Sequence, residues 1–198
     1  MLGVSAGAHP AAQLALRHPE KVAALALVVP ALYVPPEPGA PPATGPPAFM
    51  VDYVLRSNFL VWLMARLAPG LLLRAAGAPP SVQRDLSAQR RKELLDGFFP
   101  ASARHAGLTN DIRNAILGWP DLPIEEFEMP VLLVGVDDDP YLSAPIVRYS
   151  SGRIPWARAV LLERGGHVLV GQERRIRQEV RALFGAGAPN KEEIGHHQ

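Results

Sequence analysis

The opening residues MLGVSAG place Ser5 between Gly3 and Gly7 in the pattern G-x-S-x-G. This spacing is typical of a strand that turns sharply into a helix, with the flanking glycines leaving room for the strained serine and the positive end of the helix directed at it. The pattern also fits an ordinary glycine-rich turn, because so short a motif arises by chance. Ser5 therefore counts as a nucleophile only if the chain supplies its partners.

Two loops further along the chain carry those partners. A serine hydroxyl becomes nucleophilic when a histidine takes its proton, and a carboxylate holds that histidine in the right tautomer. Three aspartates at 137–139 follow the apolar run VLLVG, and His167 follows the run ARAVLL and two glycines. Taken separately, these are an acidic turn and a surface histidine. Their chain order, serine then aspartate then histidine, favours a triad of a different type from those of trypsin-like or subtilisin-like proteases.

Apolar runs of strand length predict the elements that would position these loops. Such continuous runs suit strands that are covered on both faces of a parallel sheet. Amphipathic or alanine-rich segments between the runs predict helices, so the ends of the chain follow an α/β pattern. The predicted strands are 22–29, 131–134 and 157–162, and the predicted helices are 11–18, 143–154 and 172–184.

The middle of the chain has a different character. Residues 35–47 are rich in proline, which lacks an amide donor and restricts the preceding residue, so an extended linker is predicted there. Residues 49–118 favour helices, and those expected are 49–67, 81–98 and 110–117. Charged residues and Pro69-Gly70 interrupt the apolar stretch 49–73, which favours helices at a pocket over a membrane span.

Composition restricts the classes of partner. The formal net charge is +1, which gives no reason to expect nucleic acid, and the lack of cysteine excludes disulfides and thiol nucleophiles. The polar residues 187–198 are expected to be a disordered tail, so His196 and His197 are interpreted as tail residues, not metal ligands. No targeting segment is recognised at the start, and a cytoplasmic location is expected.

With these motifs in place, the chain resembles the α/β-hydrolase superfamily, specifically its small bacterial esterase-like members. LGVSAG and ALRHPEKVAALALVVPA are similar to that family's fifth strand, third helix and sixth strand; MPVLLVGVDDDPY is similar to its acid strand and ERGGHVLVGQ to its histidine loop. The resemblance implies an α/β fold that comprises the C-terminal half of that architecture, parallel strands five to eight with flanking helices. The core would be 1–29 and 126–186, and residues 30–125 would be the linker and helical cap insertion.

The resemblance also implies a role for each site residue. Ser5 would be the nucleophile, His167 the general base and acid, and the backbone N–H of Ala6 a donor to the oxyanion. Aligning the chain on Pro140 makes Asp139 the acid that orients the histidine. Counting from the preceding glycine instead would select Asp138, which stays as the alternative.

The function implied is a serine hydrolase that cleaves an ester or related acyl substrate without a metal or organic cofactor. Apolar cap residues such as Phe49, Phe59 and Trp62 favour an apolar small-molecule substrate, although a buried core stripe explains them equally well. His105 and Asn110 are candidate pocket residues. A serine at the elbow argues against dehalogenases and epoxide hydrolases that use aspartate. It leaves open an esterase, lipase, thioesterase, C–C bond hydrolase or cofactor-free haloperoxidase.

Several features depart from the family pattern. Its first four strands have no counterpart, and there is no H-G dipeptide to supply the second oxyanion donor. The first strand would then leave an apolar edge open. Met1 is interpreted as an internal or misplaced start, and the chain alone is expected to be weakly active. The rival hypotheses are a non-catalytic remnant or binding protein of this fold, and a lipid-surface enzyme suggested by residues 49–73.

Overall fold

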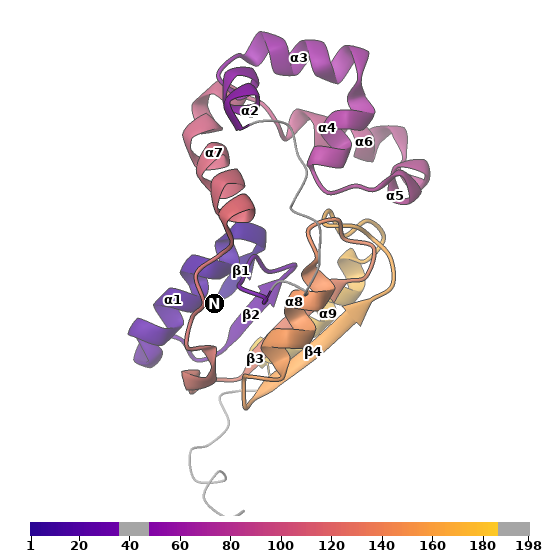
Figure 1. Ribbon diagram of the computed structural model, residues 1–198. Helices are drawn as coiled ribbons and strands as arrows, with labels where there is room; N and C mark the ends of the chain where they lie inside the picture. Colours follow the sequence, from indigo (N-terminus) through magenta and orange to yellow (C-terminus); the bar gives the residue numbers. More distant parts are fainter. Residues whose placement is uncertain (36–47, 186–198) are drawn as a thin grey trace, which may run out of the picture.

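The computed structural model describes residues 1–35 and 48–185, and a parallel sheet lies in the lower part of the view in Figure 1. Each neighbouring pair of strands is parallel, and the spatial order follows the chain. The carboxyl ends of all the strands therefore meet at one edge, where loops can bring distant residues together. The strands, in chain order, are β1 (Leu2–Val4), β2 (Leu25–Val28), β3 (Val131–Val136) and β4 (Ala157–Leu162).

Helices cover both faces of this sheet, which explains why its central strands are apolar throughout. Every residue of β2 and β3 is buried. Alternate residues such as Leu27 and Leu133 pack on one face under α1 (Ala8–Arg17) and α8 (Ser143–Ser151), and Ala26 and Leu132 pack on the other face with α9 (Glu173–Gly185). Each fully buried leucine contributes about 1.5–3 kcal/mol to folding. The predicted α/β class with parallel strands is confirmed.

The first strand forms one edge of the described sheet. Leu2 and Val4 are 52% and 48% exposed, while Gly3 between them is buried against α1. The main-chain hydrogen bonds of β1 run to β2 alone among the described residues. The edge that the sequence predicted to be open and apolar is thus exposed.

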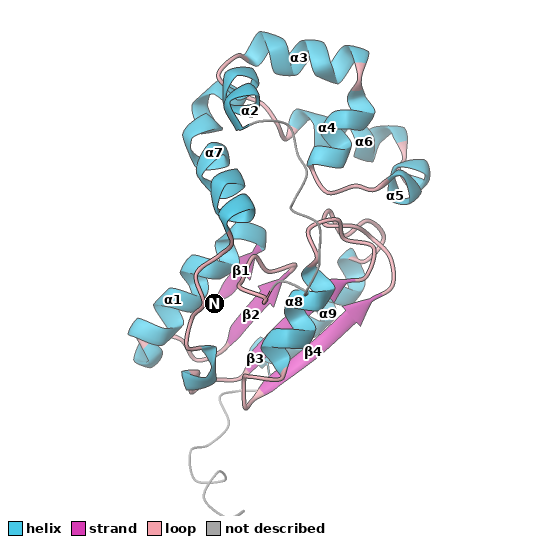
Figure 2. Ribbon diagram, in the orientation of Figure 1, coloured by secondary structure: helices cyan, strands magenta, loops and turns pink. Residues whose placement is uncertain are grey.

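Between β2 and β3 lie the helices α2 to α7, called the cap helices below after the prediction, and Figure 2 shows them gathered beyond the carboxyl edge of the sheet. Buried residues of α2, α3, α4 and α7 pack into a core of their own, centred on Leu55, Val61 and Leu72. The cap helices are α2 (Ala48–Leu55), α3 (Asn58–Leu67), α4 (Pro69–Ala75), α5 (Pro80–Asp85), α6 (Ala88–Asp96) and α7 (Ala101–Leu117).

Several helix boundaries in the cap differ from those that the sequence predicted. The single helices expected at 49–67 and 81–98 are each divided in two, because a serine begins a new helix within each. Ser57 Oγ accepts the Leu60 N–H at 3.3 Å, and Ser87 Oγ accepts the Arg90 N–H at 3.1 Å. The helix expected at 110–117 begins at residue 101 instead, so Asn110 lies inside it and does not cap it.

No single helix in residues 1–35 and 48–185 is long and apolar enough to span a membrane. α3 and α4 reach that hydropathy only as a pair, and the two are bent by 113°. The expected linker, apart from residue 35, and the expected tail with His196 and His197 lie outside the described residues.

Candidate active site

The site is built first from a strained serine at the end of β1. Ser5 follows the strand directly and begins a tight 3-10 turn (Ser5–Gly7) that continues into α1. Its φ is +52°, a left-handed conformation that costs a non-glycine residue about 1–3 kcal/mol. Its carbonyl oxygen accepts hydrogen bonds from the N–H groups of Ala8 and Ala31, which holds the turn in place.

The two glycines of the motif are not equivalent. A Cβ on Gly3 would lie 2.8 Å from Ala8 Cα and 2.8 Å from the carbonyl oxygen of Gly7, so only glycine lets the strand and α1 come this close. A Cβ on Gly7 would meet no atom within 4 Å. The expectation that both glycines make room for the turn therefore holds at Gly3 alone.

Three side chains form one chain of hydrogen bonds across the carboxyl edge of the sheet. His167 Nε2 lies 2.7 Å from Ser5 Oγ, and His167 Nδ1 lies 2.9 Å from Asp139 Oδ2. The Asp139 side chain is fully buried and that of His167 is 15% exposed. Because a carboxylate can only accept, Nδ1 carries the hydrogen and Nε2 is free to accept the serine proton.

The buried carboxylate of Asp139 is fixed from two sides. Its Oδ1 accepts the Tyr141 N–H at 2.8 Å while Oδ2 faces His167. The Ser143 hydroxyl accepts the Val136 N–H at 3.1 Å, where β3 ends and the acidic turn begins. The turn therefore presents one carboxylate oxygen to the imidazole in a defined direction.

The other two aspartates of the turn make different contacts. Asp137 forms an exposed ion pair with Arg148 at 2.6 Å. Asp138, the alternative acid, accepts the N–H of Gly166 through Oδ1 at 2.7 Å and so holds the loop that carries the histidine. Of the three, Asp139 is the one whose carboxylate contacts the imidazole.

The backbone conformation of the loop that carries His167 requires glycine. Gly165 and Gly166 have φ values of +140° and +59°. A Cβ on Gly166 would lie 2.6 Å from the carbonyl oxygen of Gly77, in the cap. These left-handed conformations, which glycine adopts without strain, turn the chain so that His167 faces Ser5.

Ala6 is the residue predicted to supply an oxyanion donor. It follows Ser5 in the 3-10 turn that starts α1, where the first N–H groups of a helix have no partner within it. These groups, with the positive end of the helix dipole, favour negative charge beside the serine.

The candidate pocket residues on α7 are not brought to the serine. The His105 Nδ1 atom lies 3.0 Å from the carbonyl oxygen of Ser102, one turn earlier in the same helix. Asn110 is exposed. Neither has a hydrogen bond to Ser5, His167 or Asp139 in the part of the chain that the structure describes.

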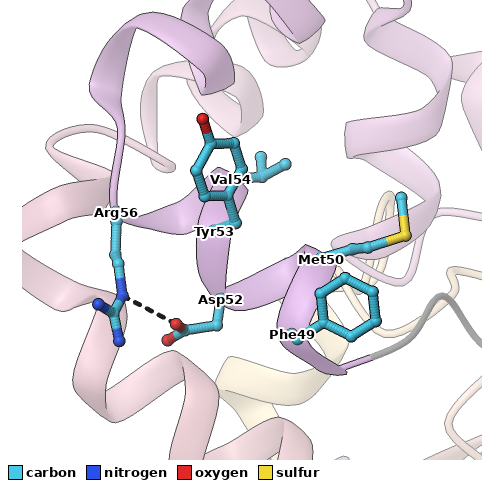
Figure 3. A pocket seen from close by; sticks show the side chains of 6 residues that line it. All are labelled: Phe49, Met50, Asp52, Tyr53, Val54 and Arg56. Carbon is cyan, nitrogen blue, oxygen red and sulfur yellow. Dashed lines mark ion pairs between the residues drawn. The ribbon is translucent and has the colours of Figure 1, made fainter.

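A pocket of about 410 Å³ lies elsewhere, on helix α2 of the cap (Figure 3). Its walls are largely apolar, and an ion pair between Asp52 and Arg56 at 2.8 Å lies at one side. Ser5, His167 and Asp139 do not line it. The lining residues are Phe49, Met50, Asp52, Tyr53, Val54 and Arg56. Among the described residues, no group of three or more histidine and carboxylate side chains is placed to hold a metal ion.

Sequence reasoning missed one aromatic neighbour of the histidine. The Tyr141 ring meets His167 edge to face, with 4.9 Å between ring centroids, and its hydroxyl donates to the carbonyl oxygen of Ala75 at 2.6 Å. Tyr141 is 46% exposed, and its partial burial, together with the charge of Asp139, raises its pKa. The signal available in the sequence was an aromatic residue two positions after the acid; its partner in the cap carries no motif.

Several solved structures resemble this structure, although their sequence identity to this chain is low. No family model and no curated protein matches the sequence. A structure described as an α/β-hydrolase fold protein from Nakamurella multipartita has a TM-score of 0.65 and 22% identity, over 94% of this chain and 69% of that one. An esterase from Exiguobacterium antarcticum has a TM-score of 0.59 and 17% identity, over 94% of this chain and 66% of that one.

Carboxylesterase CesB from Bacillus subtilis has a TM-score of 0.59 and 16% identity, over 94% of this chain and 59% of that one. The chain thus spans 59 to 69% of the length of these three chains. At these identities the likeness establishes the fold.

Proposed function

We propose that this chain, which has the α/β-hydrolase fold, is a serine hydrolase that cleaves an ester or related acyl substrate. The observation that carries the proposal is the continuous contact from Ser5 Oγ through His167 to Asp139, at 2.7 and 2.9 Å. A nucleophile, a base within hydrogen-bonding distance and a buried group that orients the base are the parts required for nucleophilic acyl transfer. The esterases among the matched structures add support from the fold.

In the proposed mechanism, Ser5 Oγ attacks the substrate carbonyl while His167 Nε2 takes the serine proton. The Asp139 carboxylate keeps the imidazole oriented and stabilises its cation. Collapse of the tetrahedral intermediate breaks the ester C–O bond, and His167 returns the proton to the departing alcohol. Water then attacks the acyl-serine with His167 as the base, which releases the acid and restores Ser5.

The oxyanion of the tetrahedral intermediate would be held by the Ala6 N–H. Loss of one donor of a typical pair lowers the rate by about 10²–10³-fold. The described residues offer Ala6 for this purpose, and the second donor expected from the fold has no counterpart motif in the sequence. Weak turnover by this chain alone therefore remains our expectation.

An apolar acyl or alkyl group is the proposed substrate class. Its support comes from the cap, where the walls of the α2 pocket include Phe49, Met50 and Tyr53, all of them exposed. This pocket is separate from Ser5, so it supports the chemical class of the substrate and not its position at the nucleophile.

Labelling with a fluorophosphonate probe tests the proposal, because the probe reacts with serines that a neighbouring base activates. Peptide mass spectrometry should find the label on Ser5, and the Ser5→Ala and His167→Ala variants should show none. Ser81→Ala and His18→Ala, which change residues outside the site, serve as matched controls that should label normally. A folded chain that acquires no label at Ser5 would favour the alternative, a non-catalytic protein of the same fold.

A further inference from the structure

The turn between α4 and α5, residues 76–79, lies directly on the histidine loop. The backbone N–H of His167 donates to the carbonyl oxygen of Gly77 at 2.8 Å. The approach is so close that a Cβ on Gly77 would lie 2.2 Å from His167 Cβ, and the φ of Gly77 is +83°. A backbone group of the cap therefore sets the position of the proposed catalytic base.

Tyr141 makes a second connection between the same two parts. It lies two residues after Asp139, its ring packs edge to face on the imidazole, and its hydroxyl reaches Ala75 at the end of α4. The ring restricts the rotation of His167, and the hydroxyl fixes the ring to the cap. Like any tyrosine, Tyr141 is protonated in the neutral range and can donate, and its raised pKa extends that range to higher pH.

Further contacts of the cap are concentrated at this loop. Val168 and Val170, which follow the histidine, pack against a buried group of α4–α5 residues that includes Leu73 and Val82. Two exposed ion pairs flank the contact, Asp85 with Arg164 at 3.4 Å and Arg90 with Glu173 at 3.7 Å. Exposed pairs contribute little each, so the apolar and backbone contacts carry most of the attachment.

From this geometry we infer that Tyr141 is a positioning residue, which couples the α4–α5 turn of the cap to the orientation of His167. The inference rests on the proposed function, because that function makes His167 the catalytic base whose orientation matters. A cap that is seated on the loop holds His167 between Ser5 and Asp139. Loss of these contacts would loosen the imidazole and lower the reactivity of the serine.

Two substitutions separate the contribution of the Tyr141 hydroxyl from that of its ring. Tyr141→Phe keeps the ring but removes the hydrogen bond to Ala75, and we expect the rate of fluorophosphonate labelling at Ser5 to fall about tenfold. Tyr141→Ala removes the ring as well, and a fall of about 10²-fold is expected. Tyr33→Phe is the matched control, because Tyr33 packs against Tyr149 and not against the histidine. Circular dichroism confirms the folded fraction, and rates are expressed per folded molecule.

A second readout does not need activity. The proton on His167 Nδ1, hydrogen-bonded to Asp139, should give a far-downfield NMR signal, which Asp139→Asn should abolish and so identify. We expect this signal to broaden in Tyr141→Phe and to disappear in Tyr141→Ala through exchange with water, while Tyr33→Phe leaves it sharp.

The two readouts keep this inference distinct from the proposed function. A chain whose Ser5 is never labelled refutes the proposed function, yet the NMR signal still reports whether Tyr141 holds the imidazole. Labelling rates and a downfield signal that are the same in Tyr141→Phe and the unaltered chain would overturn the positioning role. If Tyr141→Ala does not fold, the Tyr141→Phe result decides alone.

Discussion

The backbone N–H of His167 donates to the carbonyl oxygen of Gly77 at 2.8 Å, so a residue of the cap holds the histidine that faces Ser5. This contact joins positions ninety residues apart. It makes the cap part of the support for the proposed base, in addition to any part it has in binding substrate.

Substitution of Gly77 should therefore affect both stability and reactivity. Gly77→Ala places a Cβ 2.2 Å from His167 Cβ in a left-handed conformation, and we expect a loss of about 2–4 kcal/mol in the free energy of unfolding. Urea denaturation measures it. Gly107→Ala is the control, because Gly107 lies inside α7 with open space around it and should gain about 0.5–1 kcal/mol. A Gly77→Ala chain as stable as the parent would contradict the contact.

The two glycines of the serine motif should respond differently to alanine. Gly3→Ala forces a Cβ against the backbone of α1, and a destabilisation of about 1–3 kcal/mol is expected. Gly7→Ala enters open space with a helical φ of −67°, and its effect should stay within about 0.5 kcal/mol. Thermal unfolding of the two variants measures this difference, and equal effects would disagree with the geometry of the turn.

The candidate acids can be told apart by removing one charge at a time. Asp139→Asn should lower Ser5 labelling by about 10³–10⁴-fold, because an amide no longer holds the imidazole in the required tautomer. Asp138→Asn keeps an oxygen that can accept the Gly166 N–H, so a loss of less than about tenfold is expected. Asp137→Asn, at the exposed ion pair, is the control. A larger effect at Asp138 than at Asp139 would exchange the two roles.

A buried histidine outside the triad predicts how stability depends on pH. His9, on α1, is 8% exposed beside Trp119, and burial lowers its pKa below the ordinary value of 6.5. The unfolded chain then binds a proton that the folded chain resists, so stability is full above pH 6.5 and declines as the pH falls below it.

His9→Phe should flatten this part of the stability profile, measured by urea denaturation between pH 7.5 and about 5. An identical slope in the parent and in His9→Phe would mean that other groups cause the acid sensitivity.

Elements that follow from a local sequence pattern were predicted correctly. Elements whose ends depend on packing between distant residues were not. The strand 157–162 and the helix 172–184 were predicted within a residue or so, because a continuous apolar run and an amphipathic period each suffice. The divided cap helices were missed because a serine can cap a helix or lie within one, and packing decides which.

The same distinction applies to the site. Ser5, Asp139 and His167 stand on loops after strands, so the order of elements was enough to expect them at one edge of a parallel sheet, and the structure brings them within hydrogen-bonding distance. The contacts of Gly77 and Tyr141 with the histidine arise from how the cap folds back on the core, which no short motif records. The catalytic roles of Ser5, Asp139 and His167 stay predictions.

The central claim is that Ser5 forms a covalent acyl intermediate with the help of His167. Intact-mass spectrometry of the chain, quenched in acid during incubation with p-nitrophenyl butyrate, tests it most directly. The account predicts a species heavier by one butyryl group, which peptide mapping places on Ser5 and which Ser5→Ala and His167→Ala lack. A folded chain that gains no butyryl group, or gains it equally in the Ser5→Ala variant, would contradict the account.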